Sequence, residues 1–169
     1  MGRRQIKCHG DEDRFEIVAD YIYQYFGRGV KYIADVAGGQ GLLCRILNKK
    51  YNYEAEVIDP RGRALTGVPS KQAEYTPAMA GFYDLIVGLH PDRATRAVAE
   101  SALYRPILLV PCCNEWDKSK KLGSRELIKA IAGYLEDNGI PYHTVEFDFK
   151  KPKNIGIVAG CASVKNIAI

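Results

Sequence analysis

The chain has 169 residues, of which 47% are hydrophobic and 26% are charged. A chain of this length usually forms one domain with one core, and the composition excludes a disordered or low-complexity protein. The formal net charge of +4 is compatible with a polyanionic partner but does not identify one. No apolar run approaches the roughly 18 residues that span a bilayer, and the N-terminus lacks an apolar signal segment. We therefore expect a cytoplasmic protein with no membrane partner.

The five cysteines are odd in number and two of them are adjacent. This pattern fits neither a disulfide framework nor the paired CxxC spacing of a zinc site. We expect reduced thiols that mostly fill the core, and no metal. The five are Cys8, Cys44, Cys112, Cys113 and Cys161.

The first half of the chain begins with apolar residues at helical spacing over 15–26, and Asp11 is placed to cap that helix. The apolar run 32–36 predicts a strand. This run breaks into the small residues 37–41 before an amphipathic segment over 42–50. The pattern indicates a strand, a tight glycine turn and a helix.

The rest of the chain repeats this alternation of strand and helix. Strands are predicted at 55–58, near 72–75, at 83–88 and at 107–110, helices over 91–103 and from 124 to the Asn-Gly pair at 138–139, and a closing hairpin over 142–160. We expect one α/β domain over 1–169, with a mostly parallel sheet and an antiparallel last strand. Residues 1–30 form an N-terminal helical extension of this domain and 31–160 its core.

The glycine turn predicts a ligand site, because ligands of open α/β sheets bind beyond the carboxyl ends of the strands. Gly39 and Gly41 let the backbone approach a ligand closely. Asp59 ends the second predicted strand, 18 positions after Gly41, where a carboxylate can accept hydrogen bonds from both hydroxyls of a ribose. The turn and the aspartate together indicate a bound adenosine. The alternative is a purely structural connection without a ligand.

The dinucleotide fingerprint GxGxxG requires a glycine where this chain has Cys44, which disfavours NAD. The segment 35–41, Asp-Val-Ala-Gly-Gly-Gln-Gly, instead resembles the first motif of class I S-adenosylmethionine-dependent methyltransferases, with Ala37 in place of the first glycine. The resemblance extends over 32–160. It implies the three-layer, Rossmann-like methyltransferase fold and S-adenosylmethionine as the cofactor. The cofactor-binding positions it implies are Asp35, Ala37, Gly38, Gly39, Gly41, Asp59, Pro60, Glu74, Tyr75, Gly88 and Leu89, with Glu74 and Tyr75 as alternative contacts to adenine.

In the same family the loop after the fourth strand lines the space beside the transferable methyl group. His90 lies in that loop, and a neutral imidazole there could take a proton from an attacking hydroxyl or nitrogen while Asp92 orients it. These two residues are the predicted catalytic pair. The alternative is that His90 packs against the cofactor or hydrogen-bonds the loop and Asp92 caps the next helix.

The segment 90–95 and the pair Cys112 and Cys113 together resemble a divergent form of the family that contains the tRNA 2′-O-methyltransferases, which carry His-x-Cys-Gly-x-Ala-Thr and a later Cys-Cys-His. Here the loop is one residue shorter, its cysteine and glycine are absent, and Asn114 replaces the later histidine. The resemblance implies methyl transfer to an oxygen or nitrogen of RNA, possibly tRNA. A small molecule or a protein is the alternative acceptor. A noncatalytic cofactor-binding subunit also remains open, as does a homodimer or a partner subunit.

Overall fold

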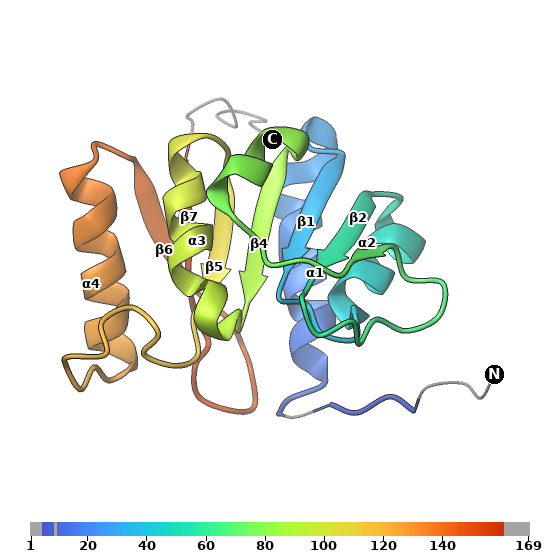
Figure 1. Cartoon of the computed structure of the whole chain (residues 1–169), viewed down its shortest axis with the longest axis horizontal. Coiled ribbons are helices and arrows are strands. Elements are labelled where there is room, and N and C mark those ends of the chain that lie inside the picture. The colour runs from blue at the N-terminus through green and yellow to red at the C-terminus, as the bar shows by residue number, and fades with distance from the viewer. Residues whose placement is uncertain (1–4, 9, 161–169) are drawn as a thin grey trace.

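The structure is a computed structural model that describes residues 5–8 and 10–160. It contains a seven-stranded sheet in the order β3-β2-β1-β4-β5-β7-β6 (Figure 1). β7 runs antiparallel to both neighbours, and the other pairings are parallel. The strands are β1 (Tyr32–Val36), β2 (Glu54–Ile58), β3 (Ser70–Lys71), β4 (Leu85–Leu89), β5 (Ile107–Val110), β6 (Tyr142–Glu146) and β7 (Ile155–Ala159), and the α-helices are α1 (Asp13–Phe26), α2 (Leu42–Tyr51), α3 (Thr95–Glu100) and α4 (Ser124–Asp137).

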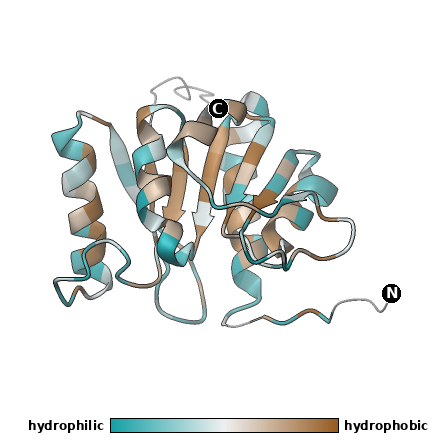
Figure 2. Cartoon of the chain, in the orientation of Figure 1, coloured by the Kyte–Doolittle hydropathy of each residue, from teal (hydrophilic) through white to brown (hydrophobic). Residues whose placement is uncertain are grey.

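Helices cover both faces of this sheet. Side chains alternate along each strand, so Ile33 of β1 packs with α1 and α2 whereas Ala34 packs with α3 and α4. β4 and β5 are hydrophobic along most of their length (Figure 2), as expected for parallel strands buried on both faces, whereas β1 also carries Asp35. The predicted fold class is confirmed: a three-layer, Rossmann-like domain with an antiparallel last strand. No helix in the described ranges is long and apolar enough to cross a membrane.

Several predicted elements begin or end where expected, and three do not. β1 and β5 have the predicted bounds. The third strand is β3 rather than 72–75, because only Ser70 and Lys71 pair with β2. The strand predicted at 83–88 is β4, which begins two residues later. The helix predicted over 91–103 begins with left-handed backbone at Asp92 (φ 46°) and is divided into a 3-10 turn, the short α3 and a second 3-10 turn.

Asp11 joins the start of α1 to the hairpin between β6 and β7. One carboxylate oxygen accepts a hydrogen bond from the Asp13 amide at 3.0 Å, as the predicted cap requires, and the other accepts one from the Lys150 amide at 2.6 Å. α1 itself packs onto the core through Val18, Ala19, Ile22 and Phe26. Among the described cysteines all four are free thiols and Cys44 is buried. Cys161 lies outside the described residues.

We expect Gly41→Ala to destabilise the fold by about 1 to 3 kcal/mol. Gly41 precedes α2 with a φ of 78°, and an added Cβ would lie 2.6 Å from a methyl of Val68 and 2.8 Å from one of Val57. Gly133→Ala in α4 is the matched control, because its Cβ would meet open space, and we expect it to stabilise by about 0.5 to 1 kcal/mol. Urea unfolding of both variants measures these changes; equal stability of the two would contradict the strain assigned to Gly41.

Candidate functional site

A cavity of about 1110 Å³ opens at the carboxyl ends of β1 and β4. The strand order reverses between these two strands, because β1 leads to β2 on one side while β4 continues the sheet on the other. Ligands of open α/β sheets bind at such a reversal. Of the predicted site residues, those that line the cavity are Asp35, Ala37, Gly38, Gly39, Leu89, His90 and Asp92.

Asp35 supplies a buried carboxylate beneath the glycine turn. It is 1% exposed, and its Oδ2 has no hydrogen-bond partner within the described ranges. Burial, with a smaller contribution from nearby Asp59, raises the pKa of Asp35 to about 7. A Cβ at Gly38 would lie 2.5 Å from Oδ2, so only glycine fits over this carboxylate. An unsatisfied buried oxygen is costly, and a ligand with N–H donors is a chemical match for it.

Asp59 fixes the glycine turn to the end of β2. Its carboxylate accepts hydrogen bonds from the Gly39 amide at 2.9 Å and from the Arg61 amide and guanidinium at 2.6 to 2.9 Å. Burial opposes ionisation of Asp59, but the bonds from Arg61 and Gly39 outweigh it and hold its pKa below the ordinary value. Asp59 itself is 2% exposed, and Arg61 lines the cavity instead. A ribose that bound Asp59 would have to take the place of the Arg61 guanidinium.

The remaining predicted cofactor contacts lie away from the cavity lining. Tyr75 is buried on the α3 side, where its hydroxyl shares a hydrogen bond of 2.8 Å with Ser101. Gly41, Pro60, Glu74 and Gly88 also lie outside the lining. Gly88 is packed inside β4, where an added Cβ would lie 3.0 Å from Pro91.

His90 lies at the cavity with a left-handed backbone, φ 53°. Its Nε2 donates a hydrogen bond to the Lys153 carbonyl at 2.9 Å. Because a carbonyl only accepts, this bond places the proton on Nε2 and leaves a lone pair on Nδ1. Burial is the main cause that lowers the pKa of His90 below its ordinary value. The neutral imidazole that a general base requires is therefore favoured near pH 7.

Asp92 contacts Cys112 rather than His90. The Cys112 thiol donates to the Asp92 carboxylate at 3.1 Å, and no bond joins Asp92 to His90 among the hydrogen bonds of the described residues. The group that orients His90 is the Lys153 carbonyl. Burial, reinforced by Asp92, raises the pKa of Cys112 to about 12, so this sulfur is a thiol at neutral pH and a poor nucleophile.

An N-terminal segment completes the cavity wall and has no signal in the sequence pattern. Gln5, Lys7 and Cys8 line the cavity. The Gln40 side chain holds this segment, because its amide donates to the Gln5 carbonyl at 2.9 Å and accepts from the Lys7 amide at 2.8 Å. Gln40 is the one residue of the glycine turn with a long polar side chain, and this is its structural role.

The fold places the chain beside solved methyltransferase structures of low sequence identity. A structure of a SAM-bound amino pentose methyltransferase from Micromonospora echinaspora matches with a TM-score of 0.55 and 14% identity over 88% of this chain and 91% of that one. A SAM-dependent methyltransferase from Aquifex aeolicus matches with a TM-score of 0.53 and 15% identity over 89% and 93%. The methyltransferase domain of bacterial CtHen1 matches with a TM-score of 0.56 and 11% identity over 88% and 97%.

Comparison of the sequence alone finds less. No protein-family model matches the chain, and no curated protein matches it. At these identities the structural similarity establishes the fold. The chain has the Rossmann-like fold of these methyltransferases, with a cavity at the point where its own sheet order reverses.

Proposed function

We propose that the protein is an S-adenosylmethionine-dependent methyltransferase with RNA as its acceptor. The observation that carries the first part is the cavity at the strand-order reversal, walled by the glycine turn and by Asp35 with its unpartnered buried oxygen. The same fold occurs in structures determined with SAM, such as the amino pentose methyltransferase. The residues present fit this cofactor, since Gly38 and Gly39 line the cavity without side chains and Asp35 offers an acceptor.

When bound, S-adenosylmethionine supplies an electrophilic methyl group on a sulfonium. Gly39 and Leu89 line the walls that would hold the cofactor, and Asp35 would accept hydrogen bonds from its N–H donors. The chain must then align the acceptor atom with this methyl group, beside His90, and exclude water from the cavity. Where the acceptor carries a proton that must leave, Nδ1 of His90 would take it, since Nε2 is bonded to the Lys153 carbonyl.

A direct test supplies S-adenosylmethionine with a tritiated methyl group to the purified protein and to separate pools of RNA, protein and metabolites. The proposal expects label in RNA. Label in metabolites or in protein would support the methyltransferase activity but show that the acceptor is not RNA. Cofactor binding without label in any pool would contradict the proposed enzymatic activity and favour a noncatalytic cofactor-binding subunit.

We expect His90→Ala to slow methyl transfer by about 100-fold or more while cofactor binding is retained, because it removes the proposed base. In the wild type the transfer rate should fall in acid through a pKa below 6.5, as the imidazole becomes protonated. Single-turnover rates from pH 5 to 8 measure both effects. His143→Ala is the matched control, since His143 lies on β6 beside Tyr21 and Tyr25. An unchanged rate in His90→Ala would contradict the role.

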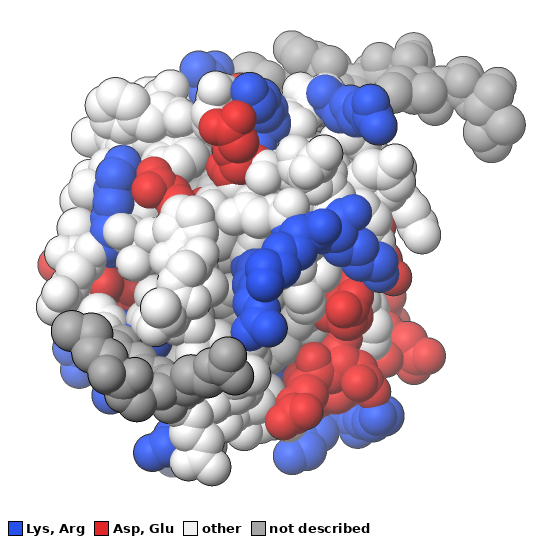
Figure 3. All heavy atoms as spheres, turned by 90° about the vertical axis from the view of Figure 1, so that its right-hand side faces the viewer, with Lys and Arg blue, Asp and Glu red and all other residues white. Residues whose placement is uncertain are grey.

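RNA is favoured as acceptor by the cations at the cavity. Lys7, Arg14, Arg61 and Arg63 line it, and such side chains bind phosphates without reading sequence. On the side of β2 and α2, a band of Lys and Arg runs beside a group of acidic residues (Figure 3), so this surface is not uniformly basic. Several basic side chains outside the cavity are paired with acids, as Lys118 is with Glu115 and Lys150 with Asp13, and at the cavity Arg61 is paired with Asp59. We therefore place the RNA contact at the cavity mouth.

A further inference from the structure

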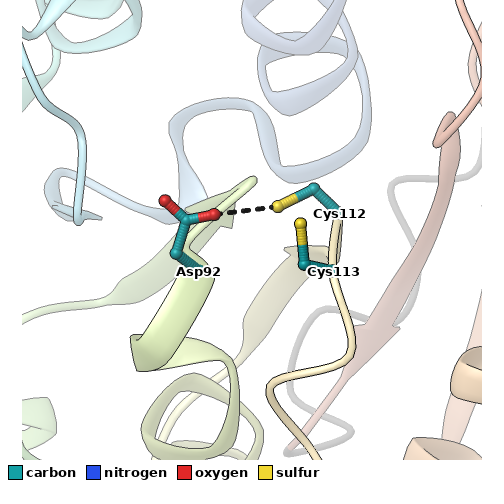
Figure 4. A group of neighbouring side chains, drawn as sticks. All are labelled: Asp92, Cys112 and Cys113. Atoms are coloured by element: carbon teal, nitrogen blue, oxygen red, sulfur yellow. Dashed lines mark hydrogen bonds between the residues drawn. The ribbon is translucent and has the colours of Figure 1, made fainter. Parts of the chain in front are cut away.

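Two cysteines and one aspartate meet at one side of the cavity. Cys112 and Cys113 follow β5, and Asp92 follows β4 (Figure 4). The sulfur atoms and a carboxylate oxygen all lie within 4.8 Å of one another. The proposed methyl transfer uses none of these three groups as its base, which leaves their convergence without a role.

The local backbone explains why both sulfurs lie near the same carboxylate. Neighbouring side chains of an extended strand point to opposite sides, but the chain bends at Cys113, so that the Cys112 sulfur points toward Asp92 and the Cys113 sulfur points toward the Cys112 sulfur (Figure 4). The Asp92 carbonyl accepts a hydrogen bond of 2.7 Å from the Thr95 hydroxyl. The parallel pairing of β4 with β5 holds the two segments side by side. The cluster is thus built by two separate parts of the fold.

The spacing is close to that of a bound tetrahedral ion. Zinc binds sulfur at about 2.3 Å and carboxylate oxygen at about 2.0 to 2.2 Å, which puts ligand atoms roughly 3.6 to 3.8 Å apart. The Cys112 sulfur and the Asp92 oxygen are 3.1 Å apart, where a proton now joins them. Small side-chain rotations would bring all three ligand atoms to the required separation.

The charges around the cluster suit a soft divalent cation. Thiolates select zinc and similar ions over magnesium. Two thiolates and a carboxylate around a divalent ion leave one net negative charge. The Lys153 ammonium lies 3.8 Å from the Cys113 sulfur, and the Arg61 guanidinium is close enough to interact with Asp92. These cations offset the excess negative charge.

We propose that Asp92, Cys112 and Cys113 bind one thiophilic divalent cation such as Zn²⁺, with a coordination position left open to the cavity. Asp92 and Cys112 line the cavity, and three protein ligands with one open position are typical of reactive rather than structural zinc sites. This differs from the expectation of no metal. That expectation came from the absence of CxxC spacing, whereas this cluster takes its third ligand from a different strand end.

The test titrates reduced, metal-free protein with Cd²⁺, whose bonds to thiolates give an ultraviolet charge-transfer band. We expect one bound equivalent with this band, displacement by Zn²⁺ and no displacement by Mg²⁺. Cys112→Ser and Cys113→Ser should each lose most of the band, and Asp92→Asn should weaken the affinity. Cys8→Ser is the matched control, because Cys8 lines the same cavity outside the cluster and should leave the band unchanged.

A wild-type protein without the band, or a band that survives in both cysteine variants, would overturn the proposal. So would the absence of Cd²⁺ binding together with a Cys112–Cys113 disulfide, detected by mass after the reductant is removed, since the pair would then be a redox pair. Thermal unfolding shows which variants are folded, and the wild-type result stands without them. The assay contains neither S-adenosylmethionine nor acceptor, so its failure leaves the proposed methyl transfer untouched.

Discussion

Asp35→Asn should weaken S-adenosylmethionine binding by about 10-fold or more, because a hydrogen bond to a charged group contributes about 1.5 to 3 kcal/mol. The substitution keeps the shape of the side chain and removes its charge. Wild-type binding should also tighten as the pH rises through about 7, where Asp35 ionises. Calorimetric titrations of both proteins at pH 6 and 8 measure this. Equal affinities at both pH values would contradict the role of Asp35.

The same variant should remove a pH dependence of stability. The pKa of Asp35 is about 7 in the fold against an ordinary value of 3.8. Between these values the unfolded chain has lost the proton that the fold retains, so wild-type stability should fall as the pH rises from about 4 to 7. We expect Asp35→Asn to lessen this fall by an amount on the order of 2 kcal/mol between pH 5 and 7.5. Asp137→Asn, at the exposed end of α4, is the control and should behave as the wild type does.

Asp59→Ala should weaken S-adenosylmethionine binding by about 30-fold, which corresponds to about 2 kcal/mol. The variant removes the predicted acceptor for the ribose hydroxyls. It also releases the Gly39 amide, which Asp59 now holds at 2.9 Å. Wild-type affinity in this variant would contradict the prediction that Asp59 contributes to cofactor binding.

Arg61→Ala separates these two contributions. Arg61 occupies the Asp59 carboxylate through its guanidinium, so a ribose at that position must displace it. Without the guanidinium, Asp59 is free to accept from a ligand and still holds Gly39. We expect Arg61→Ala to bind S-adenosylmethionine at least as tightly as the wild type. A loss of affinity equal to that of Asp59→Ala would mean that the ion pair, rather than the free carboxylate, serves the cofactor.

The sequence predicts the fold well where burial sets the pattern. β1 and β5 are buried along nearly their whole length and end at residues that change the backbone, so their limits can be read directly. β3 has two exposed residues that pair with β2, and so short a strand leaves no periodic signal. The segment predicted as one helix over 91–103 starts with left-handed backbone at Asp92, which no propensity of aspartate alone specifies.

The sequence predicts only those parts of the candidate site whose residues lie close together in the chain. The glycine turn and Asp35 occupy neighbouring positions in the chain, and both line the cavity. The contacts of His90 and Asp92 are long-range: His90 binds a carbonyl 63 positions away, and Asp92 binds a thiol 20 positions away. The segment with Gln5 and Lys7 enters the wall because a side chain of the glycine turn binds its backbone. Such contacts form only once the sheet has folded, and no characteristic spacing of residues in the sequence predicts them.

The central claim is that the cavity binds S-adenosylmethionine. Calorimetric titration of the purified protein, after removal of any copurified ligand and with NADH titrated in parallel, tests it most directly. We predict micromolar binding of S-adenosylmethionine with one site per chain and no binding of NADH. Binding of NADH alone, or of neither compound, would contradict the assignment of the glycine turn and Asp35 to this cofactor.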